Sequence, residues 1–223
     1  MPKSAYHVAV DQIQAAIRPR LGDFGFRVRG RTFNRKTDDG LTQVIDFQMG
    51  PFDPPGTLPI PVLRPNLHGL FTVNLGVYIP EVSLVRGREA KAWVREYHCE
   101  IRARLAAVSR ETRNAWWPAE ASPAVIESVR ECIDVGGVRW LERFSTRHQI
   151  LNELDDPASK RWCLPRRIVM AIILVARGDA EGARSLLLDQ LSECRTGLIP
   201  NRGHAAYVRE LAVRLGLAPL DGG

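Results

Sequence analysis

The chain contains three alternating runs: FGFRVRGRTFNRK at Phe24–Lys36, LTQVIDFQM at Leu41–Met49 and LFTVNLGVYI at Leu70–Ile79. Apolar and polar residues alternate along each of them, which is the pattern of a strand with one buried face. The first two runs are joined by Thr37-Asp38-Asp39-Gly40, a residue set typical of hairpin turns. Three consecutive strands with such connections predict an antiparallel meander.

The first run has an interruption in its alternation. Phe26 and Val28 fall on one side of the predicted strand, with Arg27 and Arg29 on the other, but Phe33 falls in phase with the arginines. We expect a β-bulge at Gly30, because one extra residue would restore the register and glycine commonly marks such a position.

Further elements are predicted on both sides of the meander. An N-terminal amphipathic helix follows the N-cap Ser4 and either ends near Ile17–Arg18 or kinks at Pro19. Its apolar stripe consists of Tyr6, Val10, Ile13, Ile17 and Leu21. A fourth strand is predicted at Cys99–Ala107, where a helix is the alternative, and a short edge strand at Asn114–Trp117.

From Ser122 onward the periodicity is helical. The predicted helices are Ala124–Asp134, Val138–Leu154, Arg166–Ala176, Ala180–Ser192 and Asn201–Leu215, with the first one ended or kinked by Gly136-Gly137. The chain is therefore predicted to be an α+β protein with an N-terminal helix, an antiparallel meander sheet of four or five strands, and a helical C-terminal half. We expect residues 1–120 and 121–223 to form one composite domain, with the helices packed on the sheet.

Charge is distributed unevenly along the chain. The formal net charge is +6, and all of this excess lies in residues 1–110, which contain the strands. This placement favours an acidic partner at the sheet. The N-terminus does not look like a signal peptide, and the longest apolar run, Ile168–Ala176, is too short to span a bilayer. Four cysteines lack Cys-x-x-Cys spacing, which favours reduced thiols in a cytoplasmic protein without a zinc site or other cofactor.

Several segments of the sheet region resemble a bacterial family. They are Gly25-Phe26-Arg27 with Gly30-Arg31-Thr32-Phe33, then Gln43–Gln48, Phe71–Val77 and Cys99–Leu105. Residues 5–120 are on this basis similar to domain-of-unknown-function family 4304. The resemblance implies a fold pattern but no catalytic residues. Because some members of this family lie near toxin genes, it also implies an immunity role.

Polar side chains on the strands form the first candidate site. We expect Asp46, Gln48, Asn74, Arg102 and Arg104 to converge if the strands are sequential neighbours. Amide and guanidinium groups in such a row can bind a peptide edge or an anion. The structural alternative is a satisfied polar seam, in which these side chains hydrogen-bond one another beneath the C-terminal helices.

Arginines of the first run form the second candidate site. Arg27, Arg29, Arg31 and Arg35 could neutralise phosphates as an arginine ladder, or they could form a solvated face that guards a strand edge. The third candidate is the proline-rich loop Gly50–Gly69, whose predicted contacts are Leu58, Ile60, Val62 and Leu63. Trp117 is a further candidate as an exposed aromatic anchor, although burial of both Trp116 and Trp117 is the alternative.

The chain carries none of the usual catalytic signatures, such as a phosphate-binding loop, a paired-histidine zinc motif or a nucleophile elbow. We therefore expect a cytoplasmic protein-binding module, of the immunity or antitoxin type, that blocks a protein with an acidic face. The alternative is a nucleic-acid-associated protein that binds through the basic strand face. A third hypothesis is an enzyme that uses Asp46, Gln48, Asn74 and Arg102. No membrane partner is expected.

Overall fold

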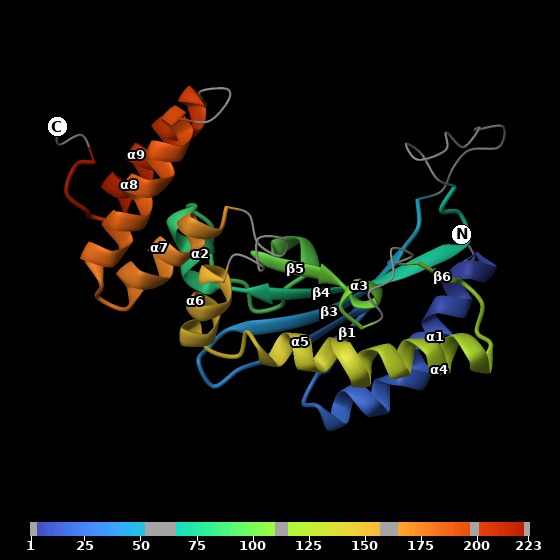
Figure 1. Ribbon diagram of the computed structural model, residues 1–223. Helices are drawn as coiled ribbons and strands as arrows, with labels where there is room; N and C mark the ends of the chain where they lie inside the picture. Colours follow the sequence, from blue (N-terminus) through green and yellow to red (C-terminus); the bar gives the residue numbers. More distant parts are fainter. Residues whose placement is uncertain (1–3, 52–65, 110–115, 157–164, 197–200, 221–223) are drawn as a thin grey trace. The chain divides into compact units, whose positions relative to one another are not determined.

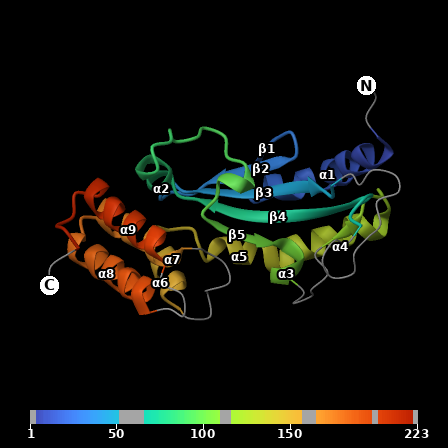
Figure 2. The same cartoon turned by 90° about the horizontal axis from the view of Figure 1, so that it is seen from above.

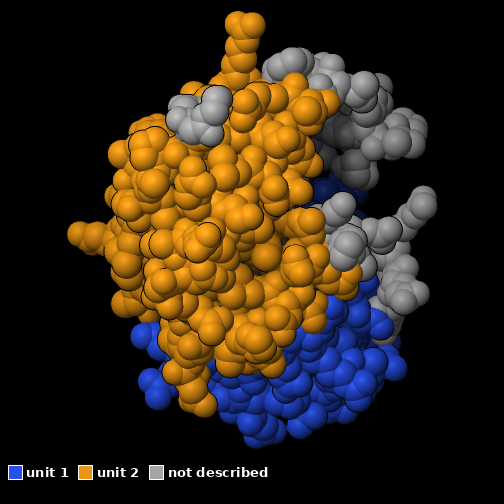
Figure 3. Space-filling model, turned by 60° about the vertical axis from the view of Figure 1, so that its left-hand side comes forward, with its two compact units in different colours: residues 1–37, 42–78, 93–143 blue, residues 38–41, 79–92, 144–223 orange. Residues whose placement is uncertain are grey.

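The computed structural model describes residues 4–51, 66–109, 116–156, 165–196 and 201–220. They form an α+β protein that divides into two compact units, coloured separately in Figure 3. The first unit comprises residues 1–37, 42–78 and 93–143, and the second comprises residues 38–41, 79–92 and 144–223. The helices of residues 123–142 thus belong to the same unit as the sheet.

The first unit is built on an antiparallel sheet. Its strands are β1 (Arg27–Arg29), β2 (Thr32–Lys36), β3 (Thr42–Met49), β4 (Leu70–Tyr78) and β5 (Ile101–Arg104), and they are neighbours in chain order. A sixth strand, β6 (Trp117–Pro118), pairs with β4. The predicted meander is therefore confirmed, and Cys99–Ala107 divides into strand β5 followed by a short helix, α3 (Leu105–Ser109).

The bulge expected at Gly30 is wrong. The chain instead reverses there, because Arg29 lies opposite Thr32 and only Gly30 and Arg31 connect the two strands. Gly30 has φ +62°, the left-handed conformation that two-residue hairpin turns require at their first central position. The first alternating run is thus a tight hairpin of two strands.

Helices cover one face of the sheet, as Figure 1 shows for α1 (Ala5–Asp23), α4 (Pro123–Cys132) and α5 (Val138–Glu142). Ser4 caps α1 as predicted, but the helix does not end near Ile17–Arg18 and instead continues through Pro19. Ile17 and Leu21, before and after the proline, are both fully buried. Their packing offsets the backbone hydrogen bond that proline removes.

Gly136 and Gly137 do not end the helix in which they lie. A π-helical turn, Ile133–Gly137, joins α4 to α5 and places both glycines against α3. A Cβ on Gly136 would lie 2.5 Å from Cα of Ser109, and one on Gly137 would lie 2.6 Å from Cδ1 of Leu105. The glycines therefore permit a close approach of two elements.

The second unit is helical, with α2 (Pro80–Val85), α6 (Arg147–Asp155), α7 (Arg166–Ala176), α8 (Ala180–Thr196) and α9 (Arg202–Arg214). The predicted hairpin of α7 and α8 is confirmed, with Gly178 at φ +86° in its turn. Figure 2 shows α8 and α9 side by side. Asn201 caps α9 by accepting a hydrogen bond from the backbone N–H of His204 at 2.9 Å.

Candidate functional site

The sheet face opposite the helices carries a row of polar residues that crosses five strands. Arg29 lies opposite Thr32, Thr32 opposite Asp46, Asp46 opposite Asn74, and Asn74 opposite Arg104. Directly paired residues project to the same face of a sheet. The predicted convergence of the strand residues is therefore present, and Thr32 and Arg29 extend it to the sheet edge.

We call this surface the polar face. Its polar members are Arg27, Arg29, Thr32, Asn34, Lys36, Thr42, Asp46, Gln48, Thr72, Asn74, Arg102 and Arg104. It is basic at both edges, because its arginines lie on β1 and β5. Amides, hydroxyls, one carboxylate and Lys36 occupy the three central strands.

The central residues of the polar face hydrogen-bond one another. The Thr32 hydroxyl donates to the Asp46 carboxylate at 2.5 Å, and the Asn74 amide donates to Oε1 of Gln48 at 2.7 Å. This is the satisfied polar seam that the structural alternative predicted, except that α4 and α5 lie on the opposite face. Because these side chains are already engaged, the arrangement argues against their use as a catalytic set.

A segment after residue 92 covers part of the polar face. The Asn34 side chain accepts from the backbone N–H of Val94 and donates to its carbonyl, both at 2.8 Å. The turn η1 (Glu96–His98) follows, and Arg102 donates to Glu96 at 2.5 Å. Cys99 packs with Val44 and Tyr78 in a buried cluster. Burial raises the pKa of the Cys99 thiol well above its usual range, so the thiol stays neutral.

Asp46 is the carboxylate at the centre of the polar face. Burial raises its pKa, the hydrogen bond from Thr32 lowers it, and the nearby Glu96 raises it again, for a net upward shift. The folded protein therefore holds a proton on Asp46 more readily than the unfolded chain does. At pH values above the pKa of Asp46 in the folded protein, its buried negative charge lowers the free energy of unfolding. This destabilisation disappears as the pH falls toward 3.8, the pKa of an aspartate in the unfolded chain.

Replacing Asp46 with asparagine is expected to stabilise the protein at neutral pH, because the amide oxygen still accepts from Thr32 while the buried charge is removed. The advantage over wild type should shrink as the pH falls through the folded pKa of Asp46, and chemical denaturation at several pH values measures it. Asp189→Asn, on the exposed side of α8, serves as the control. An advantage that does not change with pH would contradict this account of Asp46.

The arginines at the edges of the polar face are exposed. The guanidinium of Arg104 lies 4.9 Å from the ring centre of Trp116, and the side chain of Arg102 is 50% exposed despite its ion pair with Glu96. Within the described ranges, the side chains of Arg27 and Arg29 have no hydrogen-bond or ion-pair partner. These two guanidinium groups are free to meet a partner, whereas Arg102 already pairs with Glu96.

The arginine ladder does not form a single face. Arg31, in the β1–β2 turn, binds Asp11 of α1 at 2.8 Å and the carbonyl of His7 at 3.0 Å. Arg35 donates to Gln43 at 2.8 Å on the face covered by helices. Because the chain reverses at Gly30, only Arg27 and Arg29 remain on the polar face.

The predicted role of Trp117 as an exposed anchor is also wrong. Trp117 is only 7% exposed, stacks on Phe71 with ring centres 5.9 Å apart, and donates its indole N–H to Ser128.

Sequence reasoning missed Tyr97, which is 65% exposed in η1 and lies beside His98. The pattern gives no signal for Tyr97, since its segment has no periodicity. The predicted loop contacts Leu58, Ile60, Val62 and Leu63 lie outside the described residues.

The fold and its polar face define an α+β protein whose sheet exposes arginines at both edges, while residues at the centre of this face, such as Thr32 and Asn74, are buried. A family model described as Domain of unknown function (DUF4304) matches residues 66–143, which include β4, η1, β5 and the α4–α5 helix. This match confirms the resemblance to this family and covers Phe71–Val77 and Cys99–Leu105, whereas the similar segments before residue 66 lie outside it. No curated protein and no solved structure matches the chain.

Within the described residues, no helix is long and apolar enough to cross a membrane. Histidine, cysteine, aspartate and glutamate side chains do not gather in groups of three or more that could hold a metal ion, within the same part of the chain.

Proposed function

We propose that this protein is a cytoplasmic protein-binding module that holds an acidic surface of a partner against its polar face. The observation that carries this proposal is the set of exposed arginines, Arg27, Arg29, Arg102 and Arg104, at the two edges of the sheet face opposite α1, α4 and α5. In its narrower form the proposal is an immunity or antitoxin-like role, in which binding blocks the partner.

The size and chemistry of the polar face support this proposal. Four strand spacings separate β1 from β5, which corresponds to about 19 Å. Arginine and tyrosine are enriched among the residues that dominate binding energy, and exposed Tyr97 lies in the turn above this face. The buried, free thiols of Cys99, Cys132 and Cys194 support a reducing compartment.

Affinity capture from the native cell tests the proposal, with particular attention to the product of a neighbouring gene. Wild type should retain a protein partner, and the Arg27→Glu/Arg29→Glu variant should bind it at least about tenfold more weakly because like charges would then face each other. The Arg86→Glu/Arg139→Glu variant has the same net charge and should bind as wild type. Equal capture by both double variants would overturn the proposal.

A nucleic acid is the second candidate ligand of the polar face. It is favoured by the contact between Arg104 and Trp116, since arginine and aromatic side chains together bind single strands by charge and stacking. Filter binding at two salt concentrations distinguishes this candidate. Neutralisation of about three phosphates predicts a roughly fiftyfold loss of affinity between about 50 and 200 mM salt. An affinity that does not depend on salt would exclude it.

A further inference from the structure

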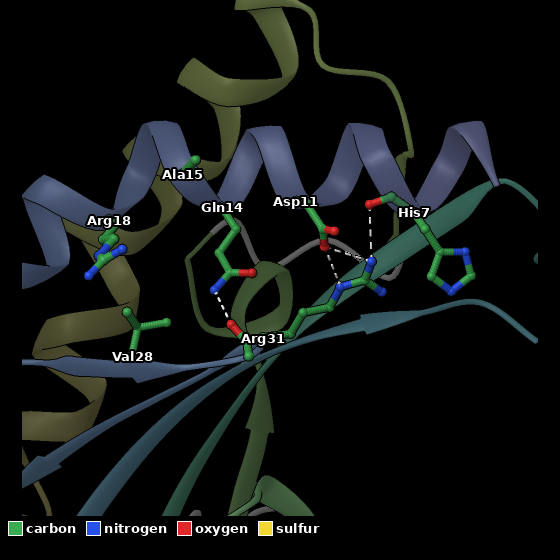
Figure 4. A pocket seen from close by; sticks show the side chains of 8 residues that line it. His7, Asp11, Gln14, Ala15, Arg18, Val28 and Arg31 are labelled. Carbon is green, nitrogen blue, oxygen red and sulfur yellow. Dashed lines mark hydrogen bonds and ion pairs between the residues drawn. The ribbon is translucent and has the colours of Figure 1, made fainter. Parts of the chain in front are cut away.

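A groove runs between helix α1 and the β1–β2 hairpin, with a volume of ≈ 770 Å³. Figure 4 shows its lining: Arg18, Gln14, Asp11 and His7 project from the helix, and Val28 and Arg31 lie below them. The groove lies along an edge of the sheet, because β1 is the terminal strand. Whatever enters it therefore also meets the backbone of β1.

The outward backbone groups of β1 are those of Val28. In a hairpin with a two-residue turn, the residues that flank the turn, here Arg29 and Thr32, form the hydrogen-bonded pair. The next pair, Val28 and Phe33, is then not hydrogen-bonded, so the N–H and C=O of Val28 point away from β2. The bond from the N–H of Phe47 to the carbonyl of Arg31, at 3.0 Å, fits this alternation. No residue in the described ranges bonds to the Val28 backbone groups.

Side chains in the groove also have unused binding capacity. Gln14 is only 8% exposed, and its amide nitrogen donates to the carbonyl of Gly30 at 2.6 Å. Its carbonyl oxygen points along the groove in Figure 4 and receives no bond from the described part of the chain. Arg18 is exposed and has no ion-pair or hydrogen-bond partner among the same residues. The groove therefore offers one acceptor that the described residues leave unbonded and one free cation.

Building on the proposed function, we propose that an extended acidic segment of the protein partner adds to the edge of β1. Successive side chains of a strand point to opposite faces of a sheet. Residues of the added segment would thus alternate between Arg27 and Arg29 on the polar face and Arg18 in the groove. Both sides favour carboxylates, and the Val28 backbone supplies the hydrogen bonds that fix the register.

Fluorescence anisotropy with a labelled peptide of three Glu-Glu-Thr-Thr repeats, which presents carboxylates on both faces of a strand, tests this mode on the full chain. Val28→Pro removes the outward N–H, and proline is tolerated in an edge strand where that group faces outward. This variant should bind the peptide about five- to tenfold more weakly, the worth of one backbone hydrogen bond. Val28→Thr keeps the N–H and the β-branched shape and should bind within about twofold of wild type. Thermal melting confirms that both variants fold.

A second pair of variants tests the charge in the groove. Arg18→Gln should weaken peptide binding, whereas Arg139→Gln, with the same net charge, should not. Strand addition is overturned if the peptide shows no saturable binding up to about 1 mM, if Val28→Pro binds as well as wild type, or if inorganic phosphate displaces the peptide completely.

These outcomes separate the two proposals. Loss of peptide binding together with a captured partner that still needs Arg27 and Arg29 would refute strand addition and leave the proposed function in place. Peptide binding that depends on Val28, without any captured partner, would support strand addition and refute the proposed function.

Discussion

Replacing Arg147 with methionine is expected to lower the free energy of unfolding by about 3 kcal/mol, because it leaves the largely buried Glu81 without its partner. Arg147 opens helix α6 and binds both carboxylate oxygens of Glu81, at 2.6 and 2.8 Å. It also donates to the backbone carbonyl of Asp39, in the turn between β2 and β3. One side chain therefore joins three segments of the second unit.

The position of these groups explains the size of the effect. The Arg147 and Glu81 side chains are only 21% and 13% exposed. The hydrogen bonds that Arg147 donates to Glu81 raise the pKa of Arg147, so the pair stays charged. Arg130→Met removes an exposed ion pair with Glu127 and should change stability by less than about 1 kcal/mol. Urea denaturation measures both variants. Similar losses in the two variants would contradict the role given to Arg147.

Replacing Gly76 with valine is expected to destabilise the first unit by about 3 kcal/mol or more, since it forces a side chain into a filled space. Gly76 lies in β4, between Val44 and Arg102 on the neighbouring strands. A Cβ there would lie 2.6 Å from Sγ of Cys99 and 2.9 Å from its Cβ. The missing side chain is what allows the segment after residue 92 to lie on the polar face.

Two comparisons isolate this cause. Gly76→Ala should also destabilise, and adding Cys99→Ala should recover part of the loss because it removes the sulfur. Gly22→Ala, in α1, meets no atom within 4 Å and should stabilise by about 0.5–1 kcal/mol. Thermal denaturation followed by circular dichroism measures each variant. If Gly76→Val were as stable as wild type, the close packing of Cys99 on β4 would be refuted.

The sheet is predicted well from the sequence because its strands and turns are encoded by residues that lie close together along the chain. Alternation over eight or nine residues identifies β3 and β4. The turn Thr37–Gly40 predicts that β3 pairs with the strand before it. Asp46 and Asn74 therefore come together as expected. The order of α7, α8 and α9 is equally readable, because Gly178 and Asn201 mark their boundaries.

The errors arise where the pattern is short or the partner is distant. A strand of three residues such as β1 has too few positions to distinguish a bulge at Gly30 from a turn. Asn34 hydrogen-bonds the backbone of Val94, sixty positions away in the sequence, and no local pattern indicates this contact. For the same reason, the covering of the polar face by η1 and the exposure of Tyr97 could not be predicted.

Arginine footprinting tests the central claim, that the polar face is the partner surface. Phenylglyoxal modifies accessible guanidinium groups, and mass spectrometry compares their modification in the free protein and in the captured complex. We predict that the partner protects Arg27, Arg29, Arg102 and Arg104, while Arg86 and Arg139 react equally in both states. Protection of Arg86 or Arg139 with the four polar-face arginines left reactive would contradict the claim.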